Sequence, residues 1–351
     1  MNVNTAILDA LTGHSVGLQR LSNATVRKVI LLLNRSDARL VDRLQREGGT
    51  DISRARLEAL ISDIRQIVDG LYRDPINYMR AELDKLAAYE GDYQFALLAK
   101  SVPIHLNWTT PSAYQIIAAT NARPFQGKLL KDWFTDLPDK AFERLRNAIR
   151  AGVVEGRTID QLTRDIRGTK AMGFKDGILE INRRDAEVTA RTAVAHTANA
   201  ARTEMYQSNG KFIKAVQWVS TLDGRTSAIC RARDGMTFPV DSGPRPPAHP
   251  GCRSTTTPVI KSLKELGISG RDLPPGTRAS MDGQVPEDLT YDGWLRQKPA
   301  AYQDEILGQS KGKLFRAGLT MDKFVSRKGD ELTLDELKAR EADIWAKANL
   351  S

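Results

Sequence analysis

Residues 215–258 read AVQWVSTLDGRTSAICRARDGMTFPVDSGPRPPAHPGCRSTTTP, and this stretch decides which kind of fold the chain adopts. β-Branched and aromatic residues dominate from Val216 to Val219, which is typical of a half-buried strand. Asp-Gly pairs at 223–224 and 234–235 are turn signals. The stretch therefore predicts a hairpin or a small sheet.

A second strand and a proline-rich loop are predicted further along the same stretch. Residues 236–240 have strand character, and Pro239 confines that strand to a sheet edge because proline cannot donate to the ladder. Residues 242–247 include three prolines, which lack an amide donor and fix φ, so this segment is an irregular loop. The loop leads to His249 and Cys252, so the position of these two residues depends on where the loop packs.

The sequence before this stretch is helical by its periodicity. Leu18 with Leu21, and Leu40 with Leu44, predict two helices, and Gly48-Gly49-Thr50-Asp51 separates them from the next one. That next helix has one apolar face, because apolar residues recur at intervals of three and four at Leu57, Leu60, Ile61, Ile64, Ile67, Val68 and Leu71. A helical hairpin or bundle is the prediction. The alternative is a long helical arm that packs on a larger partner.

Further helices are predicted at 76–99, 140–151, 159–167 and 182–207. The first follows Asp74-Pro75, and a short extended piece at Ile104 to Trp108 comes after it. A loop at Asp136-Leu137-Pro138-Asp139 is expected to lead into the second. Thr158 and Gln161 have the spacing of a capping box at the start of the third, and Gly168 ends it.

The helix at 182–207 carries polar side chains whose roles we predict as follows. His196 is expected to pack or to form a hydrogen bond rather than to bind a ligand. Arg191, Arg202 and Glu204 either make fixed polar contacts to the following strand region or face water.

After residue 266 the sequence predicts loops and short helices, because Pro274-Pro275-Gly276 interrupts any long periodicity. Short helices are expected at 291–297 and 302–307, and a final one begins at Thr333, with Glu336 three residues later. The fold class is therefore mainly α with a small β module (α+β). The chain divides into a helical region at 1–158, a central module at 159–265 and a loop-rich tail at 266–351.

The net charge of the chain is +9 and its isoelectric point is near 9.5, which favours binding to polyanions such as nucleic acid. The alternative is a solvated basic surface that never contacts DNA, since no run of five basic residues marks a dedicated arm. The longest apolar runs, such as Val29 to Leu33, are too short for a membrane span, and the polar start lacks the regions of a secretory signal. We expect the protein to be made and kept in a cytoplasm until it enters a larger particle.

Several rare residues follow one another in an order that resembles a known family. The chain is similar to the head-morphogenesis domain of tailed-phage minor head proteins, the family of the minor head protein F of phage Mu. The resemblance is carried by Trp218, Leu222-Asp223-x-Arg225-Thr226, Cys230, Asp234-Gly235, Pro247-x-His249-Pro250-x-Cys252-Arg253 and Pro258. It extends to Ala190-Arg191-Thr192, Asn199-Ala200-Ala201-Arg202, Tyr291-Asp292-Gly293-Trp294-Leu295 and Leu307-Gly308-x-x-x-Gly312-Lys313-Leu314-Phe315. Many members carry further cysteines where this chain has Ser227 and Ser254, so a four-thiol cluster is absent here.

The resemblance implies a structural minor head protein, bound to the portal or the inner capsid, that acts in head assembly and influences genome packaging or delivery. The implied partners are the portal protein, the major capsid or scaffolding protein and genomic DNA, with no membrane span. The implied location is the host cytoplasm during assembly and then the virion head near the portal. On this hypothesis the helices of residues 1–158 are portal-binding arms. The residues expected to hold the central module together without catalysis are Trp218, Asp223, Arg225, Cys230, His249, Cys252 and Arg253.

The same residues leave chemical alternatives open. A nucleic-acid-processing enzyme would use Arg225, Arg253 and His249 to hold a phosphate, or a thiol activated by His249. The thiol route is disfavoured because neither cysteine stands at a predicted helix start, where a thiol pKa falls. We expect no cofactor; zinc on Cys230, His249 and Cys252 would need a fourth ligand such as Asp223. A Cys230–Cys252 disulfide and two buried thiols are the remaining interpretations.

Overall fold

The computed structural model describes residues 3–47, 52–102, 106–262, 264–267, 277–286 and 288–350. As predicted, the fold is mainly α with a small β module. Contacts divide the chain into two compact units, and each unit combines segments that are distant in sequence. Unit 1 comprises Met1–Gly17, Tyr89–Ile116 and Asn199–Ser351, and unit 2 comprises Leu18–Ala88 and Ile117–Ala198. The division into segments 1–158, 159–265 and 266–351 stays a prediction.

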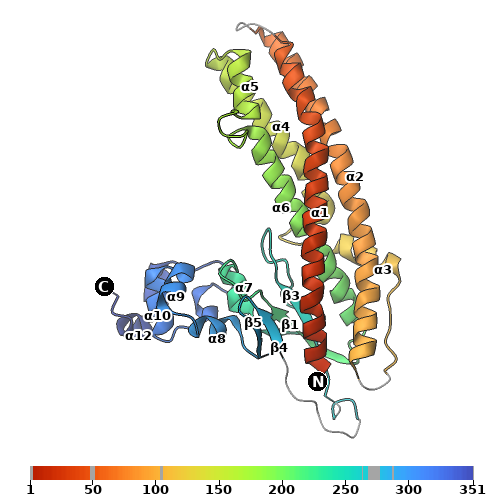
Figure 1. The fold of residues 1–351 in the computed structure, drawn as a ribbon, viewed down its shortest axis with the longest axis vertical. Helices are drawn as coiled ribbons and strands as arrows, with labels where there is room; N and C mark the ends of the chain where they lie inside the picture. The colour runs from red at the N-terminus through yellow and green to blue at the C-terminus, as the bar shows by residue number, and fades with distance from the viewer. Residues whose placement is uncertain are drawn as a thin grey trace. The chain divides into compact units, whose positions relative to one another are not determined.

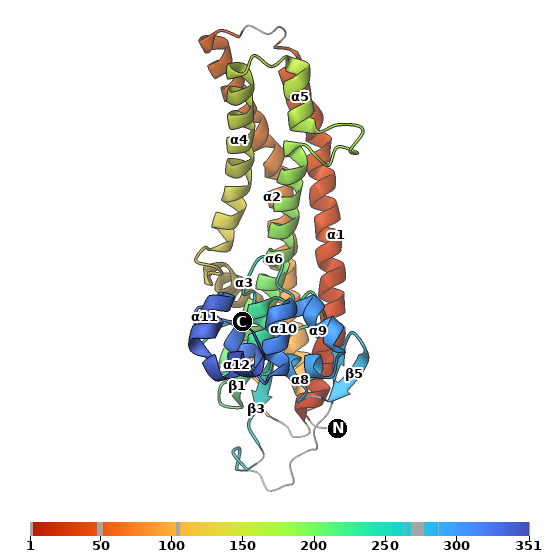
Figure 2. The ribbon, with the colours of Figure 1, turned by 90° about the vertical axis from the view of Figure 1, so that its left-hand side faces the viewer.

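Unit 2 is a helical bundle, as the periodicity predicted. It contains α4 (Leu130–Val154), α5 (Ile159–Arg167) and parts of α1 (Val3–Gln45), α2 (Arg54–Ser101), α3 (Ala113–Ala122) and α6 (Ile178–Gln207). Within the unit α1, α2, α4 and α6 run alongside one another (Figures 1 and 2). Their apolar faces meet in one core, which includes Val29, Ile64, Val68, Phe134, Leu145 and Ala190.

Three helix boundaries differ from the sequence prediction. The two helices expected before residue 48 are one continuous helix, α1, because the apolar stripe continues through the buried Val26, Val29 and Leu33 without a breaker. α2 continues through Pro75 and α4 continues through Pro138, where we expected a break and a loop. A proline inside a helix costs about 3 kcal/mol or more. Tertiary packing outweighs that cost, since buried residues flank both prolines on either side.

Two other helix predictions in unit 2 are confirmed. The side-chain oxygen of Thr158 accepts from the backbone N–H of Gln161, the Gln161 side chain accepts from the N–H of Thr158, and α5 ends at Gly168 with φ of 92°. The long helix expected at 182–207 is α6, which begins four residues earlier, at Ile178. Its small residues Ala186, Ala190 and Ala193 are buried in the bundle core, so neighbouring helices approach closely there.

His196 is a packing residue, as predicted. The residue is 2% exposed, its ring centroid lies 4.5 Å from that of Phe125, and its Nε2 lies 3.1 Å from the carbonyl oxygen of Thr120. Burial lowers the pKa of His196 from 6.5 to about 4, so the ring is neutral at pH 7.

This burial predicts a stability that falls in acid. Below pH 6.5 the unfolded chain takes up a proton at His196 that the folded chain takes up only near pH 4, so the unfolding free energy should drop by up to about 3 kcal/mol between these values. His196→Gln keeps a donor for Thr120 but cannot titrate. Urea unfolding at pH 7, 6, 5 and 4 should show a smaller decrease for the variant than for the wild type. Parallel decreases in both proteins would contradict the assignment.

Unit 1 contains the predicted small sheet. β1 (Ile213–Val219) lies between β2 (Thr237–Phe238) and β3 (Thr255–Ile260), and both pairings are antiparallel. Register pairs Val216 with Phe238 and Trp218 with Thr256. β2 is an edge strand, as expected, but it ends before Pro239, whereas the predicted strand extended to residue 240. β3 was not predicted, and it tolerates Pro258 because it is the other edge of the sheet.

The C-terminal part of unit 1 has its own core of aromatic and aliphatic residues. It contains α8 (Tyr291–Arg296), α9 (Ala300–Leu307), α10 (Gln309–Arg316), the 3-10 helix η1 (Met321–Phe324), α11 (Leu334–Arg340) and α12 (Ala342–Lys347), which gather near the C-terminus in Figure 2. The expected helices at 291–297 and 302–307 and the Thr333 cap are confirmed. A hairpin of β4 (Thr277–Ser280) and β5 (Gly283–Pro286) was not predicted.

Some sequence predictions lie outside the described residues: the separator at 48–51, the start of the extended piece at 104–105, and the interruption at 274–276. In the part of the chain that is described, no helix has both the length and the apolar character that a bilayer crossing requires.

Candidate functional site

The first part of the site is a short helix that follows β1. The chain turns after Leu222, and Ser227 then precedes α7 (Ala228–Arg233). Cys230 therefore lies in the first turn of a helix, which corrects our expectation that neither cysteine stands at a helix start. The turn predicted at 223–224 is present, but a helix follows it, and β2 pairs with β1 only after that helix.

The second part is a tight turn in the proline-rich loop. The backbone N–H of Cys252 donates to the carbonyl oxygen of His249 at 3.1 Å. Pro250 and Gly251 occupy the two central positions, and Gly251 has φ of 71°, as the third residue of a type II turn requires. The sequence His-Pro-Gly-Cys therefore brings the imidazole and the thiol of this loop together.

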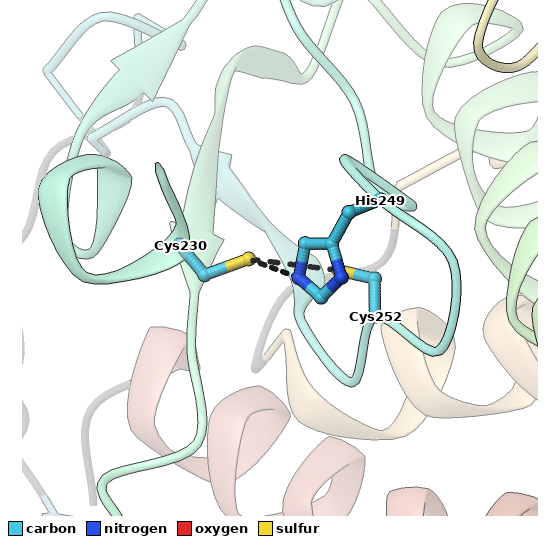
Figure 3. A group of neighbouring side chains, drawn as sticks. All are labelled: Cys230, His249 and Cys252. Atoms are coloured by element: carbon cyan, nitrogen blue, oxygen red, sulfur yellow. Dashed lines mark hydrogen bonds between the residues drawn. The ribbon is translucent and has the colours of Figure 1, made fainter. Parts of the chain in front are cut away.

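These two parts meet at three side chains. Cys230 Sγ lies 3.6 Å from Cys252 Sγ and 3.4 Å from His249 Nε2, and the three ligand atoms all lie within 4.8 Å of one another. Figure 3 shows the thiol from α7 turned toward the imidazole and the thiol from the loop. Among the residues that the structure describes, this is the one cluster of His, Cys, Asp and Glu close enough to hold a metal ion.

The proton positions of the cluster follow from its contacts. His249 Nδ1 lies 2.9 Å from the carbonyl oxygen of Pro250, which can only accept, so Nδ1 carries the proton. Nε2 is then a lone-pair atom in the neutral ring, and the Ser227 hydroxyl donates to it at 2.8 Å. A hydrogen bond from Cys230 lowers the pKa of the Cys252 thiol, and the same bond, together with burial, raises the pKa of Cys230.

Trp218, which lies on β1, packs against the two cysteines of the cluster. It is fully buried and packs with Cys230 and Cys252 in one small apolar group. Its Nε1 donates to Ser220 Oγ at 3.0 Å, and that hydroxyl donates to the Cys230 carbonyl oxygen at 2.8 Å. The tryptophan thus fixes the position of α7 as well as filling space.

The charged residues of the predicted site form a separate pair. Arg253 donates two hydrogen bonds to the Asp223 carboxylate, at 2.7 and 2.8 Å. Burial of Asp223 opposes its ionisation, but the hydrogen bond and charge of Arg253 outweigh this effect and lower the pKa of Asp223. The Arg225 side chain is 84% exposed, and its Nε lies 3.7 Å from the Asp223 carboxylate. The structure therefore places Asp223 and Arg253 together, with Arg225 beside them at the surface.

Two buried ion pairs in unit 1 escaped the sequence analysis. Asp234, which the sequence marks only as part of a turn, binds Arg278 through both carboxylate oxygens at 2.9 and 3.0 Å. Glu90 Oε1 lies 2.5 Å from Arg202 Nε. Arg202, on α6, also donates to Thr255 on β3, which confirms the predicted fixed contact from its helix to the strand region. No sequence signal pairs residues that stand so far apart in the chain.

Comparison with known families decides the assignment of the central segment. Residues 143–257 match the family model described as Phage Mu protein F like protein. This segment belongs to that family. The Mu F-like segment covers about one third of the chain and includes the cluster, Trp218 and the Asp223–Arg253 pair. The motifs quoted at 291–295 and 307–315 lie beyond the matched range. No curated protein and no solved structure showed significant similarity to the chain.

Proposed function

We propose that the protein is a minor head protein of a tailed phage that acts in head morphogenesis as a structural component. The observation that carries this proposal is the Mu F-like segment at 143–257. The contacts of its motif residues support a structural role. Trp218 is buried, Arg253 and Asp223 satisfy each other, and the two cysteines face each other in the interior.

We place the protein at the portal or the inner capsid, with helices of unit 2 as the contact surface. These helices carry large apolar side chains that the chain itself leaves exposed, namely Leu31 at 44%, Ile181 at 45% and Val188 at 41%. An apolar contact with a partner would bury them. Cytoplasm during assembly and the virion head afterwards are the locations that this role requires, and the charge of +9 suits a surface near packaged DNA.

The test is co-purification of portal protein with the tagged chain from infected-cell lysate. The wild type should retain portal protein. The double variant Leu31→Glu with Val188→Glu should recover at least about tenfold less portal protein, because two charges would be buried at the contact. Met281→Glu is the matched control, since Met281 is 58% exposed in the β4–β5 turn of unit 1. Equal recovery with all three proteins would contradict the unit 2 surface. No recovery with the wild type would contradict portal binding itself.

A nuclease that accompanies the genome is the competing function, and the same preparation tests it. Purified wild type and His249→Ala should show the same background cleavage of RNA and DNA. His249-dependent cleavage would replace the structural proposal with catalysis. DNA binding without cleavage would appear in gel shifts as an affinity that falls steeply with salt.

A further inference from the structure

The spacing of the cluster formed by Cys230, His249 and Cys252 matches the coordination sphere of a metal. In tetrahedral zinc sites the Zn–S bond is about 2.3 Å and the Zn–N bond about 2.0–2.1 Å, which places two sulfur ligands about 3.8 Å apart and sulfur and nitrogen about 3.6 Å apart. Here Cys230 Sγ lies 3.6 Å from Cys252 Sγ and 3.4 Å from His249 Nε2, and Cys252 and His249 offer ligand atoms within 4.8 Å of each other. We propose that Cys230 Sγ, Cys252 Sγ and His249 Nε2 bind one zinc ion. This proposal rests on the geometry of these side chains and is independent of the proposed function.

The imidazole is held in the form that binds a metal. Because Nδ1–H donates to the Pro250 carbonyl oxygen at 2.9 Å, Nε2 keeps a lone pair for a metal ion, and Cys230 Sγ lies 3.4 Å from it. Metal-ligating histidines commonly have such a carbonyl partner on their second nitrogen, which fixes both the tautomer and the ring orientation. The type II turn through Gly251 fixes the spacing of His249 and Cys252 in the same way.

The donor set selects the kind of metal. Two thiolates and one imidazole suit zinc, whereas magnesium and calcium require oxygen ligands. Asp223, which we considered as a fourth ligand from the sequence, binds Arg253 instead and is not a member of the cluster. The Ser227 hydroxyl, 2.8 Å from His249 Nε2, marks the remaining side of the site. A metal ion would replace this hydrogen bond on Nε2, and a water molecule would complete the four ligands.

A disulfide fits this geometry less well. Two bonded sulfur atoms lie about 2.05 Å apart. The sulfur atoms of Cys230 and Cys252 lie 3.6 Å apart, and they belong to a helix and a loop that the surrounding contacts hold in place. Zinc would link α7 to the proline-rich loop at the present spacing, across the small apolar group that contains Trp218.

Zinc content is the first measurement. The full chain is purified under reducing conditions, exposed to zinc sulfate and dialysed, and metal is measured by mass spectrometry. The wild type should hold about one zinc per chain, and Cys230→Ser, Cys252→Ser and His249→Gln should each hold less than about a fifth of that. Ser242→Ala is the matched control and should keep the wild-type amount, because Ser242 is exposed in the same loop and its hydroxyl donates to Asp241. Zinc below stoichiometry in the wild type, or retained by the ligand variants, would overturn the proposal.

Two further measurements test the site without the variants that remove a ligand, which could lose zinc by failing to fold. Cobalt added to the reduced wild type should give thiolate-to-cobalt charge-transfer absorption, which requires sulfur ligands. Ser227→Cys places a third thiol beside the site and should slow zinc release to a chelator at least about tenfold. Absence of the cobalt band, or release from Ser227→Cys as fast as from the wild type, would count against the site. A ligand variant that loses zinc but still recovers portal protein would show that zinc binding and portal binding are independent properties.

Discussion

Asp234→Ala is expected to lower the free energy of unfolding by about 3–5 kcal/mol, because it leaves a buried arginine without its counter-charge. The Asp234 carboxylate accepts four hydrogen bonds: two from Arg278, one from the backbone N–H of Ser220 at 2.7 Å and one from that of Tyr291 at 2.7 Å. It thereby joins the end of β1, the β4–β5 hairpin and the start of α8. Denaturant unfolding of the full chain measures the loss.

Asp241→Ala is the control for this prediction, since Asp241 is exposed and lies in the nearby proline-rich loop. Its unfolding free energy should stay within about 0.5 kcal/mol of the wild type. Asp234→Asn should fall between the two, because the amide keeps one acceptor oxygen but loses the charge. If Asp234→Ala unfolds at the same denaturant concentration as Asp241→Ala, the ion pair does not hold these elements together.

Glu90→Gln is expected to cost a comparable amount and to change the response to acid. The Glu90 carboxylate is fully buried between Arg202 and His14, which lie 2.5 and 2.6 Å away. Burial alone would raise its pKa, but the charge of Arg202 and the contacts of His14 together lower the pKa of Glu90 to about 2. Replacing the carboxylate leaves the buried Arg202 without its counter-charge, which costs about 3–5 kcal/mol.

The sign of the acid response follows from the lowered pKa of Glu90. Its stabilising contribution is fully present above the ordinary pKa of 4.5 and is lost as the pH falls toward 2, by up to about 3 kcal/mol. Unfolding free energy measured from pH 5 to pH 2 should therefore fall more steeply in the wild type than in Glu90→Gln. Glu82→Gln, which removes the surface pair with Lys85, is the control and should change the unfolding free energy by less than about 1 kcal/mol. Identical slopes in all three proteins would contradict the buried pair.

The sequence predicted those elements that are stabilised by residues a few positions apart in the chain. The capping boxes at Thr158 and Thr333 satisfy helix-start donors within four residues, and the structure has them where the spacing placed them. The strand at Val216 to Val219 and the edge position of Pro239 follow from side-chain shape and a missing donor in the same way. The candidate site was predicted in part, since one turn of His-Pro-Gly-Cys brings two of its members together.

The prediction failed where the deciding energy comes from distant residues. Pro75 and Pro138 break helices by local rules, yet α2 and α4 continue because their neighbours are buried in a core built from other segments. β3 was missed because its partner β1 lies about forty residues earlier in the chain, and a short edge strand with a proline has a weak pattern of its own.

The helical class, the caps, the small sheet and the family of the central segment follow from the residues alone, because periodicity, turn chemistry and rare residues in fixed order act within short stretches. The contacts of Cys230 with His249 and Cys252, of Asp234 with Arg278 and of Glu90 with Arg202 arise only once the chain has folded. All three have one cause. Buried charges and thiols are tolerated only beside a partner, and chain folding, which brings distant segments together, determines which partner that is.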